Sequence, residues 1–322
     1  MKNILISSAG RRVSLIRSFI KEANKINKNI KIYAADANPN SSAACLVADA
    51  WFRVPLLDSK DYLNILIEEC KRYNIGLIIP TIDTELQILA DNISKLRENG
   101  IDAVISDSSF VKKCRDKRMI HDFFESKGVQ VAKEYPKDKL EFPLFIKPSD
   151  GSRSVDIYYI ETQEDLTDYH FSNDKFMFLE YLDQELYWEY TCDLYYDKKD
   201  NLKCVVPRKR IEVRDGEVNK GKTEKNELVP FIKNHLQTIK GARGCLTVQF
   251  FFNENLKKII GIEINPRFGG GYPLSYLAGA NFPKWIIEEY LLGNSVKYFD
   301  EWEKNLLMLR YDDEILVHDY EE

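Results

Sequence analysis

The sequence has no apolar run that approaches the about 20 residues needed by a membrane-spanning helix. Residues 1–6 form a short apolar run that soon reaches Arg11 and Arg12, too short for the hydrophobic part of a secretory signal. These absences predict a cytoplasmic protein without a membrane partner.

The six cysteines include no CxxC pair, so neither a zinc site nor a disulfide framework has support from their spacing. We therefore expect reduced and mostly buried thiols. The chain also has no excess of positive charge, because its net charge is −5. A nucleic-acid partner is not expected, since such proteins present a basic face.

The 322 residues, with 44% hydrophobic and 30% charged, are enough for two or three compact units. The first 107 residues alternate between strand-like and helix-like segments, which favours a parallel α/β sheet. We predict strands at 3–7, 30–35, 76–79 and 102–106, and helices at 13–24, 61–73 and 85–99.

The pattern changes after residue 107. Residues 108–128 are mostly helical, and the chain then becomes rich in strands. We predict strands at 144–147, 156–160, 176–181, 190–196, 202–207, 246–252 and 258–264, and helices at 228–239 and 285–292. The fold class is therefore α/β, with an α+β C-terminal part.

A small-residue turn, residues 8–12, joins the first strand to the first helix. It contains only Gly10 and does not match GxGxxG, although Asp36 ends the second strand where a nucleotide-binding domain often places an acid. A dinucleotide site is therefore disfavoured. Arg11 and Arg12 either bind a carboxylate or phosphate, or are solvated residues at a helix start.

Two lysines stand out further along. Lys117 lies on a helix, and Lys147 ends an apolar strand before Pro148. The loop at 149–154 is small and polar, so its backbone N–H groups could approach phosphate oxygens closely. A simple turn is the other interpretation of this loop.

A hairpin carries the strongest local pattern. Glu263 and Asn265 are two residues apart and share one face of a strand, and the hairpin brings Gln249 opposite them. Their oxygens suit Mg²⁺ that bridges phosphates. The alternative is a surface strand with alternating polar residues.

A basic run follows the strand at 202–207. On a strand, Arg208 and Arg210 share a face and could bind an anionic substrate in bidentate fashion. A solvated charged strand is equally compatible with this pattern. The glycines at 269–271 follow the hairpin, and we expect them to shape the substrate entrance.

Together these motifs resemble the ATP-grasp superfamily, in particular the group similar to the large subunit of carbamoyl phosphate synthetase. Biotin carboxylase and D-alanine–D-alanine ligase are more distant relatives. The turn at 8–12 and the segments 36–39 and 80–85 resemble its pre-ATP-grasp domain. Residues 116–117 and 145–148 resemble its two ATP-binding lysines, and Gln249 with 263–267 resembles its metal and catalytic motif.

The resemblance implies a role for each matching residue. Lys117 and Lys147 would hold ATP phosphates, and Glu189 would hold the ribose. The metal, Mg²⁺ or Mn²⁺, would be bound by Gln249, Glu263 and Asn265. The loop over the phosphates would consist of Ser149, Gly151, Ser152, Arg153 and Ser154, and the strand beside the adenine of Glu180, Tyr181 and Leu182. The catalytic residues would be Arg267, Lys147, Glu263 and Asn265. The residues that contact the substrate would be Arg208, Arg210, Arg214, Lys222 and Gly270.

The resemblance also implies an architecture. A Rossmann-like pre-ATP-grasp domain (1–107) would precede a two-lobed ATP-grasp domain (108–295), and a tail (296–322) would pack on the catalytic lobe. The small lobe would cover about 113–185 and the catalytic lobe about 186–295. Two departures from the family are a phosphate loop with one glycine and a long segment at 183–188.

The implied function is an ADP-forming ligase that joins a small carboxylate to an amine through an acyl phosphate. Homodimers are common in the family, whereas the sequence does not fix the oligomeric state. One alternative is an ATP-grasp phosphotransferase without amine ligation. Another is a non-catalytic nucleotide-binding regulator. A dinucleotide-dependent oxidoreductase is the third, and the incomplete glycine turn disfavours it.

Overall fold

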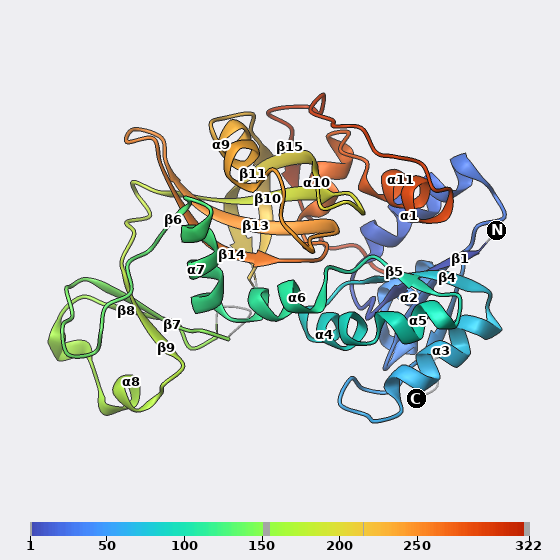
Figure 1. Ribbon diagram of the computed structural model, residues 1–322, viewed down its shortest axis with the longest axis horizontal. Helices are drawn as coiled ribbons and strands as arrows, with labels where there is room; N and C mark the ends of the chain where they lie inside the picture. The colour runs from blue at the N-terminus through green and yellow to red at the C-terminus, as the bar shows by residue number, and fades with distance from the viewer. Residues whose placement is uncertain (1, 151–154, 215, 319–322) are drawn as a thin grey trace.

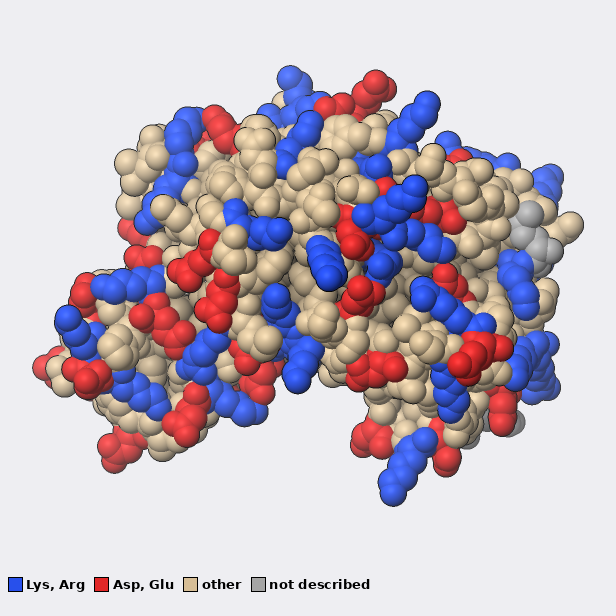
Figure 2. Space-filling view, in the orientation of Figure 1, with Lys and Arg blue, Asp and Glu red and all other residues tan. Residues whose placement is uncertain are grey.

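The computed structural model describes residues 2–150, 155–214 and 216–318. The described chain builds three β-sheets with five, seven and three strands (Figure 1). Figure 2 shows a notch in this face of the molecule, between the projecting three-stranded sheet and the N-terminal part.

The N-terminal sheet has the order β3-β2-β1-β4-β5, and every neighbouring pair is parallel. The predicted parallel α/β sheet is therefore confirmed. Its central strands β1 and β4 are buried over almost their full length, as expected for strands that helices cover on both faces. The strands are β1 (Asn3–Ser7), β2 (Ile32–Asp36), β3 (Ala50–Arg53), β4 (Ile75–Pro80) and β5 (Asp102–Ala103).

Helices cover both faces of this sheet. α1 (Val13–Ile26) and α2 (Ala43–Val47) pack on the face of Ile4 and Ile6. The face of Leu5 is covered by α3 (Tyr62–Arg72), α4 (Asp83–Asp91), α5 (Ile93–Glu98) and α6 (Ser108–Arg115). The helix predicted at 85–99 is thus two helices, which meet at Asn92, and the strand predicted at 102–106 pairs only over its first two residues.

The three-stranded sheet has the antiparallel order β8-β7-β9. Its strands are β7 (Leu144–Pro148), β8 (Tyr158–Ile160) and β9 (Phe176–Glu180), with the short helix α8 (Asp168–Ser172) beside them. Leu144, Ile146, Phe176 and Phe178 form a small core of their own. The unit is therefore held together largely by its own apolar contacts.

The seven-stranded sheet has the order β15-β12-β11-β10-β13-β14-β6 and is antiparallel except between β14 and β6. The predicted strand at 202–207 continues through the basic run and forms a hairpin with a strand that the sequence pattern did not predict. The strands are β6 (Gln130–Val131), β10 (Trp188–Tyr196), β11 (Leu202–Arg214), β12 (Glu217–Thr223), β13 (Gly244–Asn253), β14 (Lys258–Asn265) and β15 (Leu307–Leu309).

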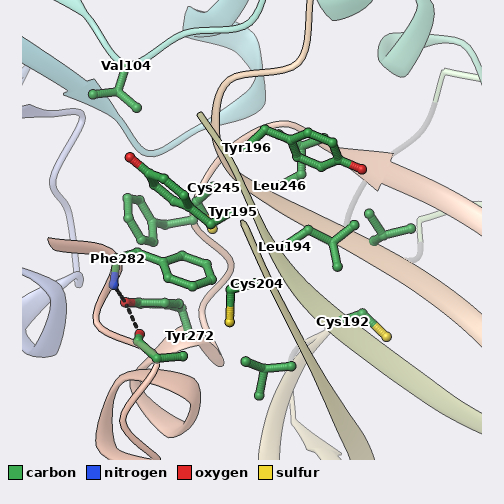
Figure 3. Close-up of a cluster of buried hydrophobic side chains, with 14 of the residues drawn as sticks. Val104, Cys192, Leu194, Tyr195, Tyr196, Cys204, Cys245, Leu246, Tyr272 and Phe282 are labelled. Atoms are coloured by element: carbon green, nitrogen blue, oxygen red, sulfur yellow. Dashed lines mark hydrogen bonds between the residues drawn. The ribbon is translucent and has the colours of Figure 1, made fainter. Parts of the chain in front are cut away.

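One core joins the seven-stranded sheet to the N-terminal sheet. Phe19 of α1 meets Phe268 edge to face, with ring centroids 6.0 Å apart, and α1 also packs against α10 (Tyr272–Leu277) and α11 (Phe282–Ile286). Figure 3 shows part of this core, where three cysteine side chains lie among aromatic and aliphatic groups. All six cysteines are free thiols, and five of them are buried.

Along the described parts of the chain, no helix has both the length and the apolar character required to cross a bilayer.

Candidate active site

The two predicted phosphate lysines lie near each other and near the hairpin. Lys117 is the first residue of α7 (Lys117–Ser126), where its N–H donates to the carbonyl of Ser149 at 2.8 Å. Lys147 lies on β7 and is 9% exposed, and its ammonium group has no hydrogen-bond or ion-pair partner among the described residues. Burial lowers the pKa of Lys147 to about 8, with Glu263 opposing and Lys117 adding to that shift.

The hairpin of β13 and β14 holds the predicted metal ligands on one face of the sheet. Gln249 pairs with Glu263 in the strand register, and Asn265 donates its side-chain N–H to Glu263 Oε1 at 2.7 Å. Thr191 pairs with Gln249 on the other side, so that β10 continues the same face. These side chains form what we call the polar face of the sheet: Glu189, Thr191, Gln249, Glu263 and Asn265.

Glu189 stands at the edge of the polar face and forms an ion pair with Arg210. Burial raises the pKa of Glu189, while Arg210 opposes this shift. The charges of Glu189 and Lys147 also influence each other, so the carboxylate lies within electrostatic reach of the buried ammonium. Its predicted contact with a ribose stays a prediction.

The predicted adenine strand ends next to an apolar cluster. Leu182, Tyr187 and Ile260 are buried together, with Phe251 packed against them. The backbone N–H of Glu180 donates to Lys133 and that of Tyr181 to Pro143, whereas the N–H of Leu182 has no acceptor among the described residues. Apolar side chains beside a backbone donor that has no described acceptor are the kind of surroundings that the edge of a purine base requires.

The predicted phosphate loop can be followed only at its first residues. Ser149 accepts from Lys117 and donates its own N–H to the carbonyl of Lys175 at 2.8 Å, so the loop starts beside the first turn of α7. Gly151, Ser152, Arg153 and Ser154 lie outside the described residues.

The N-terminal turn satisfies its own polar groups. The N–H of Gly10 donates to Asp36 Oδ2 at 3.0 Å, and the N–H of Arg12 donates to the carbonyl of Ala9. Asp36 is therefore used to hold the turn.

The four basic residues predicted to contact the substrate each have an acidic partner within the chain, whereas Lys209 lies over the ring of Trp188. Arg208 is 1% exposed and forms a bidentate pair with Asp193, at 2.7 and 3.0 Å. The remaining pairs are Arg210 with Glu189, Arg214 with Asp312 and Lys222 with Glu224. Much of the charge of this run is thus neutralised internally, and its contact with a substrate stays a prediction.

The glycine run, residues 269–271, packs against side chains of the seven-stranded sheet. A Cβ at Gly269 would be 2.9 Å from Thr247 Oγ1, and one at Gly270 would be 2.5 Å from the carboxylate of Glu217. A Cβ at Gly271 would collide with Arg208 Nη1. The absence of side chains here lets the backbone close over polar groups of the sheet.

Arg267 joins this site to the N-terminal sheet. Its Nη2 donates to Asp83 Oδ2 at 2.8 Å, and Asp83 is the first residue of α4. Both side chains are largely buried, at 16% and 19% exposed. The Nε of Arg267 has no partner among the described residues, so this guanidinium retains an unused donor.

Two family models match the chain. Residues 4–105 match a model described as the N-terminal domain of PylC-like proteins, and residues 172–313 match one described as ATP-grasp in the biosynthetic pathway with Ter operon. The chain belongs to the ATP-grasp superfamily. No curated protein sequence matches it significantly.

Solved structures share the ATP-grasp fold over almost the whole chain. The biotin carboxylase domain of the 2-oxoglutarate carboxylase from Hydrogenobacter thermophilus is 16% identical, with a TM-score of 0.73 and coverage of 95% of this chain and 73% of that one. N5-carboxyaminoimidazole synthetase from Staphylococcus aureus is 16% identical, with a TM-score of 0.69 and coverage of 96% of this chain and 80% of that one. L-amino acid ligase from Bacillus licheniformis is 14% identical, with a TM-score of 0.66 and coverage of 90% of this chain and 74% of that one. At such identities the likeness concerns the fold.

The sequence pattern missed two residues of this candidate site. His121 is buried one helical turn after Lys117, and its Nε2 has no partner among the described residues. Burial lowers the pKa of His121 to about 4, with Lys147 and Lys117 adding to the shift, so the imidazole is neutral near pH 7. Its spacing from Lys117 was a usable signal. Asp83 carried no such signal, because its partner Arg267 is far away in the sequence.

Proposed function

We propose that this ATP-grasp protein is an ADP-forming ligase, which phosphorylates a small carboxylate and then transfers the acyl group to an amine. The observation that carries the proposal is the meeting of Lys117 and Lys147 with the polar face of the hairpin. Each lysine has a pKa that the charge of Glu263 influences, although their segments are far apart in the sequence. Both pKa values are lowered mainly by burial, and an anion between the lysines would compensate their charge.

The residues fit a magnesium-bound nucleotide. Among the described residues, neither the ammonium group of Lys147 nor the N–H of Leu182 has a partner, and Leu182 belongs to a buried apolar cluster. Gln249, Glu263 and Asn265 would hold Mg²⁺ through oxygen atoms, and the ion would supply charge compensation for the phosphates. The similar biotin carboxylase domain from Hydrogenobacter thermophilus was solved with magnesium ADP and bicarbonate, and as a dimer. By analogy we also propose a homodimer.

The chain's own groups have separable tasks in the proposed reaction. Lys117 and Lys147 bind and orient the phosphates as point charges, which favours in-line transfer of the γ-phosphoryl group to the carboxylate oxygen. Arg267 lies beyond the end of β14 and stabilises the negative charge that spreads over the transferring group. The amine nitrogen then attacks the acyl carbon, the C–N bond forms, and phosphate leaves with the proton lost from the amine.

A screen of carboxylates and amines for ADP release tests this proposal. A ligase releases ADP and phosphate in quantity only when both substrates are present. Release of ADP with one acceptor and formation of a stable phosphorylated product would instead indicate a phosphotransferase. Absence of any ADP release, despite binding of magnesium ATP, would favour a regulatory protein.

Glu263→Gln tests the assignment of the metal ligand. The substitution keeps the size of the side chain and removes its charge, so we expect loss of ADP release with an unchanged thermal unfolding midpoint. Glu254→Gln, at the exposed turn of the same hairpin, is the matched control and should retain activity. Near-normal ADP release by Glu263→Gln would refute the assignment.

A further inference from the structure

Next to the proposed active site lies a cluster of charges from distant segments, which we call the three-arginine cluster: Arg12, Arg267, Arg310, Asp83 and Glu217. Arg12 Nη1 is 3.3 Å from Glu217 Oε1, and Arg310 Nη1 is 3.0 Å from Glu217 Oε2. Arg267 pairs with Asp83 at 2.8 Å. Within this cluster, three cations therefore face two carboxylates. Further charges lie within electrostatic reach of it: Arg11 acts on Glu217, Asp312 interacts with Arg310, and Glu263 acts on Arg267.

Burial and the neighbouring charges both act on the pKa of Arg12. Burial lowers the pKa of Arg12, and the neighbouring charges of Arg267 and Arg310 lower it further, while Glu217 opposes them. Arg12 is thus a guanidinium whose positive charge is only partly compensated. An anion that entered the cluster would complete the compensation.

The cluster is within reach of a ligand and close to the catalytic motif. The side chains of Arg12, Glu217 and Arg310 are 21%, 35% and 40% exposed. The carboxylate of Glu217 lies against Gly270, only three residues after Arg267 in the sequence. Three residues of extended chain span at most about 10 Å, so anions near Arg267 and near Glu217 could belong to one small molecule.

We propose that Arg12 and Arg310 bind a second anionic group of the substrate, in addition to the carboxylate that is phosphorylated. The substrate class is therefore a small dianion, such as a dicarboxylate. Glu217 keeps the two guanidinium groups in position and competes with the ligand for them. This inference rests on the proposed ligase function, because it takes the reacting carboxylate to lie near Arg267.

Isothermal titration calorimetry of the full chain with magnesium ADP present tests the inference. The probes are matched pairs that differ by one negative charge: succinate and glutarate against their monomethyl esters, and L-glutamate against L-glutamine. At least one dianion should bind about tenfold more tightly than its partner, as expected for a charge-assisted contact. Arg12→Ala should abolish this preference and leave the affinity for magnesium ADP unchanged.

Glu217→Gln separates a ligand site from a structural ion-pair network. If Glu217 competes with the ligand, its neutralisation tightens binding of the dianion by about threefold or more. If these ion pairs only stabilise the fold, dianion binding would instead be lost in both Arg12→Ala and Glu217→Gln. Arg72→Ala is the matched control, because Arg72 forms an exposed ion pair with Glu69 on α3.

Three results would overturn the inference. Either no dianion binds more tightly than its matched partner, Arg12→Ala keeps the preference for the dianion, or Glu217→Gln weakens dianion binding as Arg12→Ala does. Failure of the ligase proposal looks different, because the ADP-release screen would then give no turnover with any acid and amine. If magnesium ADP binds and turnover occurs without a preference for dianions, only the present inference fails.

Discussion

The ammonium group of Lys147 lies in the protein interior, where a charge without a partner is unfavourable. Three carboxylates, those of Glu263, Glu189 and Glu134, partly compensate it, and Lys117 acts against it. Such a residue destabilises the folded protein as long as it is protonated. The structure retains it beside the polar face, which is expected if a bound triphosphate supplies the missing negative charge.

The lowered pKa of Lys147 predicts a pH-dependent affinity for nucleotide. Phosphate binding requires the protonated amine, and the pKa in the free protein is about 8. The apparent Kd for magnesium ADP should therefore rise above pH 8, approaching about tenfold per pH unit. Calorimetry from pH 7 to 10 measures this. Lys147→Arg should show a flatter profile with weaker binding, because a guanidinium stays charged over this range.

The effect of Lys147 on folding stability changes with pH in the opposite direction to its effect on nucleotide binding. The folded-state pKa of Lys147 lies below its ordinary value of 10.5, so protonation is less favourable in the folded than in the unfolded chain. The unfavourable contribution is complete below pH 8 and disappears as the pH rises toward 10.5. A Kd for nucleotide that is constant from pH 7 to 10 would contradict this account of Lys147.

At the scale of elements, the glycine segment that follows β14 packs closely against the sheet because glycine has no side chain. Gly271 lies over the buried Arg208, whose Nη1 has no partner among the described residues. Arg208 is itself held by Asp193, which also accepts a hydrogen bond from Ser275 of α10 at 2.6 Å. The glycine segment, β11 and α10 therefore pack around one buried ion pair.

Gly271→Ala should lower the free energy of unfolding by about 1–3 kcal/mol, the usual effect of overpacking. The added Cβ would collide with Arg208 Nη1 and lie 2.5 Å from Val218 Cγ1, and neither group can move freely. The midpoint of urea unfolding measures the change. Gly270→Ala is the control for stability: the three atoms nearest to its Cβ are those of the Glu217 carboxylate, at the far end of a side chain that can move, so a smaller change is expected. Equal changes in both variants would exclude this packing explanation.

At the scale of the whole molecule, the N-terminal sheet contributes directly to the proposed active site. Asp83 starts α4 at the end of β4, and its ion pair with Arg267 joins that sheet to the catalytic hairpin. The shared core around Phe19 and Phe268 fixes the two sheets against each other. Asp83 thus acts as a positioning residue for Arg267.

Asp83→Asn should lower turnover by about tenfold or more, because Arg267 loses the ion pair that orients it toward the transferring group. The Kd for magnesium ADP should not change, since the two lysines bind the phosphates. ADP release and calorimetry provide the two measurements. Asp58→Asn, an exposed position in the same N-terminal part, should change neither. A parallel loss of nucleotide affinity in Asp83→Asn would point to a general structural effect instead.

Residue patterns were sufficient to predict most of the local elements of this fold, although not the strand β12. The strand-and-helix alternation of the first 107 residues predicted the parallel sheet, because helix and strand periodicities are properties of short segments. The alternation of Gln249, Glu263 and Asn265 in two adjacent strands likewise predicted that they share one face. The short turn between these strands, residues 254–257, determines that register locally.

Only the tertiary structure decided which charges are paired. The basic residues of β11 and β12 were predicted to face a substrate, but Asp193, Glu189, Asp312 and Glu224 lie beside them. Arg267 meets Asp83 across 184 positions of the chain. Ion pairs between distant segments have no local sequence signature, because their geometry depends on how the sheets pack. The sequence alone therefore determined the elements and the face of the hairpin, and packing determined which cations remain for a ligand.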